Sequence, residues 1–154
     1  MNYTFDYNVS NQNLQFITHE KLFSPASPDK GTLAMLEKIE IEETDKVLDL
    51  GCGYGFVGVV LKSSNPSIKV DMVDKDPMAI EYAYKNIKNN DLDIRAWVSI
   101  GFADVKDHDY TKILSNPPYH ADFSVAKGFI EEGFKRLLIK GQMILVVKRL
   151  LWYK

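Results

Sequence analysis

The sequence has one cysteine, no long apolar run and no large excess of charge of either sign. Because Cys52 is the only cysteine, the chain forms no internal disulfide, and a thiol inside a glycine-rich turn is expected to pack rather than react. No stretch reaches the ~18 apolar residues that cross a bilayer. The polar start at residues 1–4 lacks the basic-then-apolar order of a secretory signal. We therefore expect a cytoplasmic protein without a membrane segment. The net charge of −2 argues against a strongly basic nucleic-acid coat.

The length and composition favour one domain, residues 1–154. A chain of 154 residues with 45% hydrophobic content can bury one sizeable core but not two. Segments 3–7 and 14–17 alternate apolar and polar residues around a polar stretch, which is typical of a β-hairpin. We therefore expect residues 1–22 to form an N-terminal hairpin extension and residues 23–154 to form the main body of the domain.

After residue 30, helical segments and short apolar strands follow one another. This pattern predicts a doubly wound, mostly parallel α/β sheet covered by helices on both faces. Ligands of such sheets lie at the carboxyl ends of the strands. The expected strands are 46–50, 68–73, 94–99, 110–115 and 142–148, and the expected helices are 32–40, 56–63, 77–89 and 123–139.

A glycine-rich turn follows the strand at 46–50. Gly51, Gly53 and Gly55 stand between this strand and the next helix, where residues without a Cβ can turn tightly beside a ligand. Asp74 ends the next strand, where a carboxylate could accept hydrogen bonds from a ribose diol. Glycines at a turn and an acid at a strand end can also be purely structural. The complete set nevertheless favours nucleotide-type binding.

The same glycines do not determine which nucleotide-type cofactor would bind. Gly53 to Gly58 satisfies G-x-G-x-x-G, so a dinucleotide-dependent oxidoreductase is a second interpretation. Asp49 disfavours it, because a carboxylate just before the first glycine would repel a pyrophosphate and could attract a cationic ligand.

The tetrapeptide Asn116-Pro117-Pro118-Tyr119 comes directly after the strand at 110–115. An exocyclic amine on a base, or a carboxamide, is a poor nucleophile because its lone pair is delocalised. Two acceptors on its N–H bonds make the nitrogen more electron-rich in the transition state. The Asn116 side-chain oxygen and the Pro117 carbonyl can be these acceptors, since a following proline holds each residue extended. Tyr119 can stack on a planar acceptor. A sulfonium methyl group attacked in line would then need no nucleophilic residue and no metal.

Three motifs in this order resemble those of the class I S-adenosylmethionine-dependent methyltransferases. Residues 47–55 look like the first motif, residues 73–80 like the second, and residues 115–120 like the catalytic motif of the amino-group-modifying members. Residues 23–32 resemble the F-S-x-x-x-x-D-x-G-S/T segment of the small-domain methyltransferases, whose best-known members methylate the guanine 2-amino group of small-subunit ribosomal RNA. The resemblance covers about residues 14–150. It implies a Rossmann-like methyltransferase sheet, S-adenosyl-L-methionine as cofactor and RNA, expected to be ribosomal, as substrate.

The resemblance also assigns roles by position within a cofactor-binding and catalytic core at residues 23–154. It places Asp49, Gly51 and Gly53 at the cofactor's amino-acid part, Asp74 at its ribose and Thr32 near it, and it counts Gly55 among the cofactor-binding residues. Asn116, Pro117 and Tyr119 would be catalytic, and Pro118, Tyr119 and His120 would contact the substrate. A methylated ammonium loses its proton readily, so His120 need not be a general base and its role stays open.

The sequence departs from the family in three places. Gly101 stands where relatives usually have an Asp or Asn for the adenine amino group, with Asp104 three residues on. Thr111 replaces a frequent Asp at the start of the fourth strand. Family members normally continue past the fifth strand with a helix and an antiparallel hairpin, so the strand at 143–147 should be an apolar sheet edge. We expect either a truncated form or a homodimer formed through that edge.

Other functions remain open from the sequence. The tetrapeptide recognises a planar amino group rather than the molecule that bears it, so adenine of DNA and glutamine of proteins are alternative substrates. A nicotinamide-dependent oxidoreductase and a non-catalytic RNA-binding module are the alternatives from other classes. The expected function is methyl transfer to an exocyclic amine, with guanine in ribosomal RNA as the first candidate.

Overall fold

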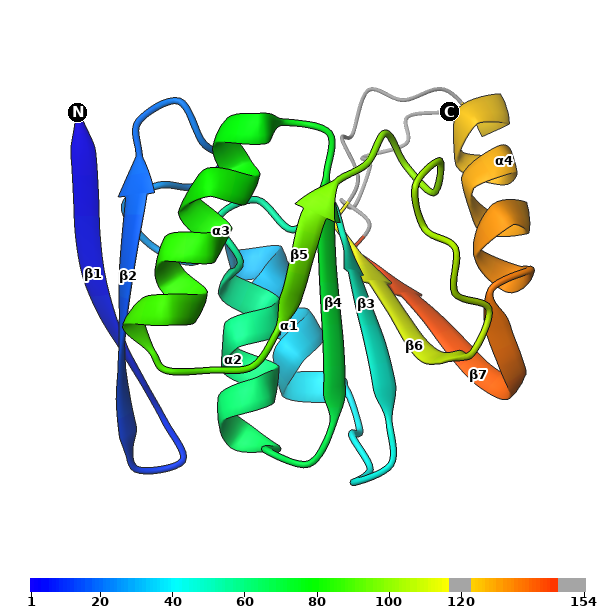
Figure 1. Ribbon diagram of the computed structural model, residues 1–154, viewed down its shortest axis with the longest axis horizontal. Coiled ribbons are helices and arrows are strands. Elements are labelled where there is room, and N and C mark those ends of the chain that lie inside the picture. Colours follow the sequence, from blue (N-terminus) through cyan, green and yellow to red (C-terminus); the bar gives the residue numbers. More distant parts are fainter. Residues whose placement is uncertain (117–122, 147–154) are drawn as a thin grey trace, which may run out of the picture.

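The computed structural model describes residues 1–116 and 123–146 and is built around a five-stranded parallel sheet with helices on both faces (Figure 1). The strands lie in the order β5-β4-β3-β6-β7, and every neighbouring pair is parallel. They are β3 (Lys46–Leu50), β4 (Lys69–Asp74), β5 (Arg95–Val98), β6 (Tyr110–Ser115) and β7 (Leu137–Leu145). The expected doubly wound α/β fold is confirmed. The order reverses between β3 and β6, so a ligand crevice is expected at their carboxyl ends.

Two apolar clusters form the core, one on each face of the sheet. Because side chains alternate along a strand, Val47 of β3 faces one cluster while Leu48 faces the other. The first cluster lies under α1 (Lys30–Lys38), α2 (Phe56–Ser64) and α3 (Pro77–Asn89), and the second faces α4 (Phe123–Phe134) (Figure 1). Both faces of the central strands are therefore buried, which explains why those strands read as continuous apolar runs.

The expected N-terminal hairpin is confirmed as a separate two-stranded sheet. It consists of β1 (Asn2–Val9) and β2 (Gln12–His19), which pair antiparallel. Ser10 and Asn11 form the turn with φ of 49° and 62°, and two successive left-handed residues match the twist of a tight hairpin. The hairpin packs against α2 and α3 beside the main sheet (Figure 1).

Helix α3 has the bounds that its sequence predicts. Asp76 caps its first turn by accepting a hydrogen bond from the Met78 N–H at 2.9 Å, and Pro77 occupies the first turn, where its missing N–H has no intrahelical partner. Within the described part of the chain, no helix is long and apolar enough to span a membrane.

The boundary between α4 and β7 differs from the expected one. The helix expected over 123–139 ends at Phe134, and residues 137–139 belong to β7, which begins before the expected residue 142. An apolar run such as 137–139 fits either a helix or a strand, and pairing decides it here: Leu137 is the register partner of Tyr110, and the Tyr110 N–H donates to the Arg136 carbonyl at 3.1 Å. The ladder is irregular before Lys112, and Ile139 is 95% exposed at this point.

Candidate active site

A cavity of about 280 Å³ lies at the carboxyl end of the sheet, where the strand order reverses. Its walls come from the segment before α1, the loop after β3, the end of β4 and the end of β6. The sequence-predicted residues that line it are Thr32, Asp49, Gly51, Gly53, Asp74 and Asn116. Residues far apart in the sequence thus meet at one crevice, as the parallel sheet requires.

The glycine loop has left-handed backbone at each of its three glycines. Gly51, Gly53 and Gly55 have φ of 76°, 56° and 92°, a region that other residues rarely adopt. The Gly51 and Cys52 N–H groups both donate to the Val73 carbonyl at 2.9 Å. These two groups therefore fasten the loop to β4. In a loop that binds phosphate, such N–H groups would instead point toward the ligand.

Asp74 braces this loop from the end of β4. Its Oδ2 accepts from the Gly53 N–H at 2.8 Å, and its Oδ1 accepts from the Asp76 N–H at 2.9 Å. Each carboxylate oxygen keeps a second lone pair that can accept from a hydroxyl group in the cavity. The carboxylate lies where the sequence predicts it and also has a structural contact that the sequence did not reveal.

Asp49 is a buried acid with one oxygen unsatisfied. It is 4% exposed, and its Oδ2 has no hydrogen-bond partner among the residues that the structure describes. Burial raises the pKa of Asp49 to about 7, the Gly58 N–H opposes this by donating to the carboxylate, and the nearby charge of Asp74 adds to the rise. An orphaned carboxylate oxygen at the cavity wall is an acceptor for a cationic or N–H-bearing ligand.

Asn116 is joined to the N-cap and the first turn of α1. Its Nδ2 donates to Asp29 Oδ2 at 3.1 Å and to Thr32 Oγ1 at 3.2 Å. Thr32 was expected near the cofactor; it lines the cavity and contacts Asn116 as well. Asp29, which was not among the expected site residues, belongs to the same constellation. Pro117, Pro118, Tyr119 and His120 lie outside the described residues.

Two further residues hold the glycine loop in place. Buried Asn86 of α3 donates to the Tyr54 carbonyl at 2.8 Å, and it exchanges hydrogen bonds with Ile17 of the hairpin, at 2.7 Å to its N–H and 3.0 Å to its carbonyl. The Tyr54 hydroxyl donates to the Ser24 carbonyl at 3.1 Å. A polar residue on the buried stripe of α3 was the sequence signal for Asn86, whereas nothing local in the sequence marks the Tyr54 contact.

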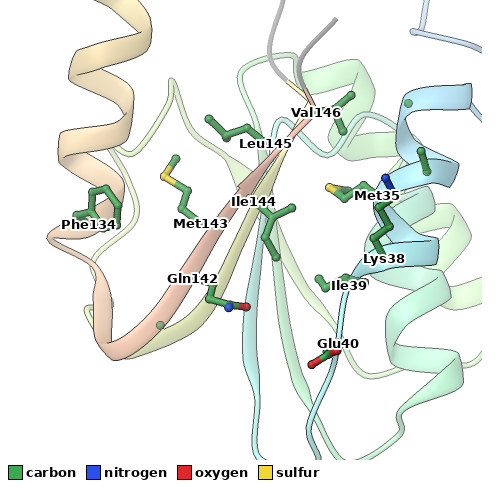
Figure 2. Close-up of a pocket in the computed structure, with 13 residues that line it drawn as sticks. Met35, Lys38, Ile39, Glu40, Phe134, Gln142, Met143, Ile144, Leu145 and Val146 are labelled. Carbon is green, nitrogen blue, oxygen red and sulfur yellow. The ribbon is translucent and has the colours of Figure 1, made fainter. Parts of the chain in front are cut away.

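A larger hollow, of about 830 Å³, lies between α1 and the outer strand β7 (Figure 2). Met35, Ile39 and Ile144 face it, with Lys38 and Gln142 at its sides. None of the residues of the glycine loop lines it, and neither does Asp74 or Asn116. The smaller cavity at the strand ends is the candidate site because it brings the polar groups of the motifs together.

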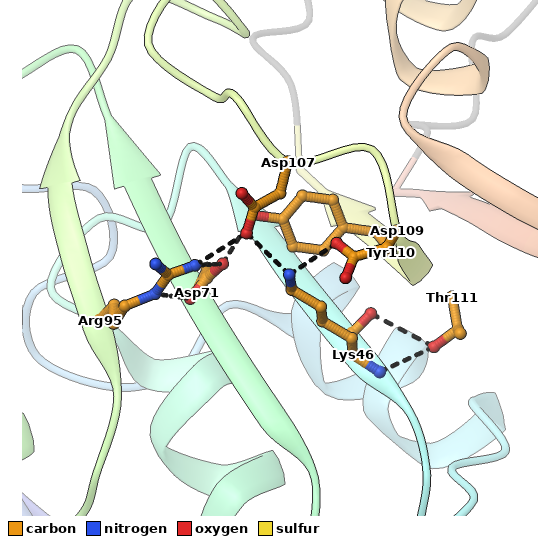
Figure 3. A network of polar contacts seen from close by, with 7 residues as sticks. All are labelled: Lys46, Asp71, Arg95, Asp107, Asp109, Tyr110 and Thr111. Atoms are coloured by element: carbon orange, nitrogen blue, oxygen red, sulfur yellow. Dashed lines mark hydrogen bonds and ion pairs between the residues drawn. The ribbon is translucent and has the colours of Figure 1, made fainter.

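The amino ends of the strands carry a network of paired charges (Figure 3). The Lys46 ammonium donates to Asp107 at 2.7 Å, and the Arg95 guanidinium donates to Asp107 at 3.0 Å and to Asp71 at 2.7 Å. The Lys46 and Arg95 hydrogen bonds lower the pKa of Asp107 below its usual range. In contrast to the cavity, this end of the sheet satisfies its charges internally.

Neither a metal-binding cluster nor a reactive thiol is present among the described residues. Residues 1–116 and 123–146 contain no group of three or more His, Cys, Asp or Glu side chains that could hold a metal ion. Cys52 is buried, and burial raises the pKa of its thiol well above the usual value. A thiol of this kind is a packing residue rather than a nucleophile.

Known proteins resemble this chain in sequence and fold. The ribosomal RNA small subunit methyltransferase C of Psychromonas ingrahamii is 32% identical over 98% of this chain and 44% of that protein, and the one of Aliivibrio fischeri is 36% identical over 86% and 40%. The chain thus spans less than half the length of these curated relatives.

Solved structures show the same fold. A T. thermophilus 16S rRNA N2 guanine methyltransferase in complex with AdoMet and guanosine superposes with a TM-score of 0.77 at 24% identity, covering 89% of this chain and 39% of that one. A methyltransferase from Pyrococcus furiosus gives a TM-score of 0.72 at 23% identity, covering 86% and 68%. The sequence model of the methyltransferase small domain matches residues 13–154, and the chain therefore belongs to that family.

Proposed function

We propose that this chain carries an S-adenosyl-L-methionine-dependent N-methyltransferase site, with guanine in ribosomal RNA as the substrate. One observation supports this above the others. The unsatisfied, buried carboxylate of Asp49 and the side chain of Asn116 line the same cavity at the carboxyl ends of β3 and β6. The Asp49 carboxylate suits the positive charge of a methyl donor, and the Asn116 amide beside it can accept from the amine that receives the methyl group.

The residues present fit this cofactor. Asp49 Oδ2 would accept from its ammonium group, which compensates for the burial of the carboxylate. Asp74 would accept from its ribose hydroxyls through its remaining lone pairs. The glycine loop leaves space beside Gly51 and Gly53, where an added Cβ would meet no atom within 4 Å. Thr32 completes the proposed cofactor-contacting set. Gly55, which was expected to contact the cofactor, does not line the cavity, and a Cβ added to it would lie 3.2 Å from the Met72 sulfur.

The same geometry disfavours a pyrophosphate cofactor. The Gly51, Cys52 and Gly53 N–H groups are already bonded to β4, and the Asp49 and Asp74 carboxylates line the cavity beside the glycine loop. Carboxylates attract a cation and repel a phosphate chain. A methyl donor with a positive sulfonium and ammonium is therefore favoured over a nicotinamide dinucleotide.

Catalysis would depend on acceptors for the target amine. When bound, S-adenosylmethionine supplies an electrophilic methyl group. The Asn116 side-chain oxygen and the Pro117 carbonyl would accept from the two N–H bonds and orient the nitrogen for in-line attack. Tyr119 and Pro118 would contact the base, and the resulting ammonium would release its proton to water, so we assign His120 contact with the substrate only. These roles of residues 117–120 follow from the family motif.

Two observations support the substrate. The curated relatives are named for methylation of small-subunit ribosomal RNA, and the related T. thermophilus structure is a complex with AdoMet and guanosine. A ribosomal RNA substrate would also place the protein in the cytoplasm. Adenine in DNA and glutamine in proteins present a similar planar amino group. Experiment must distinguish these two alternative substrates from guanine.

The deciding experiment uses methyl-labelled S-adenosylmethionine with separate RNA, DNA and protein fractions, followed by nucleoside analysis. We expect label in RNA as N2-methylguanine. Label confined to DNA or protein would reject the guanine assignment. Tight binding of reduced nicotinamide cofactor without binding of S-adenosylhomocysteine would reject the methyltransferase itself. Binding of S-adenosylhomocysteine with no label in any fraction would indicate a non-catalytic module.

Two variants test the residue roles. Asn116→Ala should lower kcat by a factor of ~10² or more and leave cofactor affinity nearly unchanged, because it removes an acceptor that acts on the amine. Asp74→Ala should weaken cofactor binding first. Unaltered turnover in Asn116→Ala, or unaltered cofactor affinity in Asp74→Ala, would reject the corresponding role.

We further propose that the outer edge of β7 pairs with a second copy of this chain. Within the described residues β7 has one strand neighbour, β6, and Leu138 and Ile139 are 49% and 95% exposed nearby. An unpaired apolar strand edge favours pairing with another strand. Sedimentation equilibrium should show a dimer that weakens on dilution, and a monomer at all concentrations would contradict the proposal.

A further inference from the structure

We propose that Asp29, assisted by Thr32, is a positioning residue that fixes and polarises the side-chain amide of Asn116. The inference rests on the proposed methyl transfer to an amine, in which the Asn116 oxygen accepts from the target N–H. It adds a residue that does not touch the amine itself but decides which end of the Asn116 amide faces it.

The contacts form a compact set at the start of α1. Asp29 is the N-cap residue, with φ of −66° and ψ of 139°, and its Oδ2 accepts from the Thr32 N–H at 3.2 Å. The same oxygen accepts from Asn116 Nδ2 at 3.1 Å, and Thr32 Oγ1 accepts from Asn116 Nδ2 at 3.2 Å. One helix terminus therefore holds the amide nitrogen of a residue 87 positions away in the sequence.

These contacts determine the orientation of the amide. A side-chain amide has two N–H donors on one atom and its acceptor oxygen on the other. With Nδ2 turned toward the Asp29 carboxylate and the Thr32 hydroxyl, Oδ1 lies on the opposite side of the group. The flipped amide would set Oδ1 against a carboxylate, which repels it. The amine-accepting orientation is thus selected before any substrate arrives.

The carboxylate also affects the strength of the acceptor. A hydrogen bond from Nδ2 to a charged oxygen draws electron density from nitrogen toward Oδ1 through the amide π-system, and linked hydrogen bonds strengthen one another. Asn116 Oδ1 should therefore be a stronger acceptor than an amide held by neutral partners. This effect acts on catalysis and has little reason to change cofactor affinity.

The Asp29 contacts are held by the surrounding loop. Thr32 is 8% exposed, and the segment before α1 is tied down on two sides. Thr18 Oγ1 donates to the Pro25 carbonyl at 2.5 Å, and the Tyr54 hydroxyl donates to the Ser24 carbonyl at 3.1 Å. The same segment thus touches the glycine loop and Asn116, so it can keep the amine acceptor in register with the cofactor cavity.

Asp29 has two tasks, helix capping and amide positioning, and variants can separate them. Asp29→Ser retains a good N-cap but shortens the side chain so that it no longer reaches Asn116. Asp29→Asn retains the cap and the length but removes the charge and adds an amide that can pair with either orientation of Asn116. Glu37→Gln removes one acidic charge from an exposed position on the same helix and is the matched control.

The test measures kcat, KM, S-adenosylhomocysteine affinity and thermal unfolding for each variant on the RNA that the wild type methylates. We expect Asp29→Ser and Asp29→Asn to lower kcat about tenfold, the size of a lost charged hydrogen bond. Cofactor affinity and the unfolding temperature should stay near the wild-type values, and Glu37→Gln should match the wild type throughout. Thr32→Val should lower kcat less, with Thr32→Ser recovering most of the difference.

A second measurement does not depend on turnover. The side-chain NH₂ signals of Asn116, assigned by their loss in Asn116→Asp, should shift in Asp29→Ser and exchange faster with water. Wild-type kcat together with unshifted NH₂ signals in Asp29→Ser would overturn the inference, and so would a rate loss that only follows a loss of thermal stability. A wild type that methylates nothing would instead reject the proposed function, while the NH₂ signals would still decide whether Asp29 holds Asn116.

Discussion

Two buried acids on neighbouring strands of one sheet have opposite surroundings. Asp71 of β4 is 3% exposed and Asp49 of β3 is 4% exposed. Asp71 faces the amino-end network, where Arg95 donates to its two oxygens at 2.9 and 2.7 Å and the Tyr110 hydroxyl donates at 2.6 Å (Figure 3). Asp49 lines the cavity, and within the described part of the chain its Oδ2 has no hydrogen-bond partner.

The difference shows how one fold can divide its acids between structure and binding. A buried carboxylate is stabilising only when hydrogen-bond donors replace the water that it loses. The protein supplies those donors to Asp71 and leaves part of the requirement of Asp49 unmet. A ligand that donates to Asp49 would therefore remove the free-energy cost of its burial, and this would favour binding.

The sharpest contrast should come from replacing Asp71. Asp71→Ala leaves the fully buried Tyr110 hydroxyl without its acceptor and breaks the pair with Arg95. We expect the free energy of unfolding, measured by urea denaturation, to fall by about 3 kcal/mol. Asp109→Asn, at an exposed partner of Lys46, is the control and should change it by less than ~1 kcal/mol. Equal effects of the two variants would remove the distinction between the buried network and surface ion pairs.

The same change of acid to amide at Asp49 should have the opposite sign. At pH 8 without ligand, Asp49→Asn replaces a buried, incompletely paired charge by a neutral group. We expect the free energy of unfolding to rise by about 1–2 kcal/mol, whereas Asp71→Asn should lower it. Affinity for S-adenosylhomocysteine, measured by calorimetry, should fall about tenfold in Asp49→Asn. Destabilisation of the ligand-free protein by both variants would show that Asp49 is as well satisfied as Asp71.

Cofactor affinity should depend on pH through Asp49. The pKa of its carboxyl is raised to about 7, so at pH 6 the folded protein holds this group mostly neutral and at pH 8 mostly ionised. Only the ionised form accepts from a ligand ammonium. The affinity for S-adenosylhomocysteine should therefore rise about tenfold from pH 6 to pH 8 and level off above it.

The stability of the ligand-free protein should show the reverse trend. Because the folded pKa of Asp49 lies above its usual 3.8, the folded protein binds a proton that the unfolded chain has released between about pH 4 and 7. The contribution of Asp49 to the free energy of unfolding is fully present below its unfolded pKa. It is lost as pH rises through its folded pKa. Asp49→Asn should remove both trends, and a variant that retains the pH-dependent affinity would locate the titrating group elsewhere.

Local sequence signals fixed the elements where they agreed with the tertiary structure. Helix α3 has the expected bounds because Asp76 and Pro77 mark its start, and β6 (Tyr110–Ser115) coincides with its apolar run. The predicted end of α4 was wrong because the apolar run 137–139 suits a helix and a strand equally. The pairing of Leu137 with Tyr110 places this run in β7. Pairing across the sheet is a property of the fold that no local window contains.

The site was predictable in its members but not in its connections. The spacing of strand, glycines and acid indicated Gly53 and Asp74, yet the N–H groups of the loop turn toward β4 rather than toward a ligand. The contact between Asp29 and Asn116 joins two segments that meet only because α1 begins beside the end of β6. Hydrogen-bond partners of this kind depend on side-chain orientation in three dimensions, which residue types and spacing do not specify.

The smallest expected effect concerns Thr111 at the amino end of β6. Its hydroxyl accepts from the Lys46 N–H at 2.9 Å and donates to buried Asp45 at 2.7 Å. Burial raises the pKa of Asp45, but hydrogen bonds from Thr111, the Glu42 N–H and Lys112 outweigh it and lower the pKa below its usual value.

Thr111→Val should therefore lower the free energy of unfolding by about 1 kcal/mol at pH 7, and Thr111→Ser should restore most of it. Thr111→Asp should destabilise more than Thr111→Val because it sets a second carboxylate beside Asp45. Urea denaturation of the three variants at one pH measures the order. If Thr111→Asp equals or exceeds the wild type in stability, a second carboxylate is tolerated beside Asp45, and the amino end of the sheet is less completely paired than its contacts indicate.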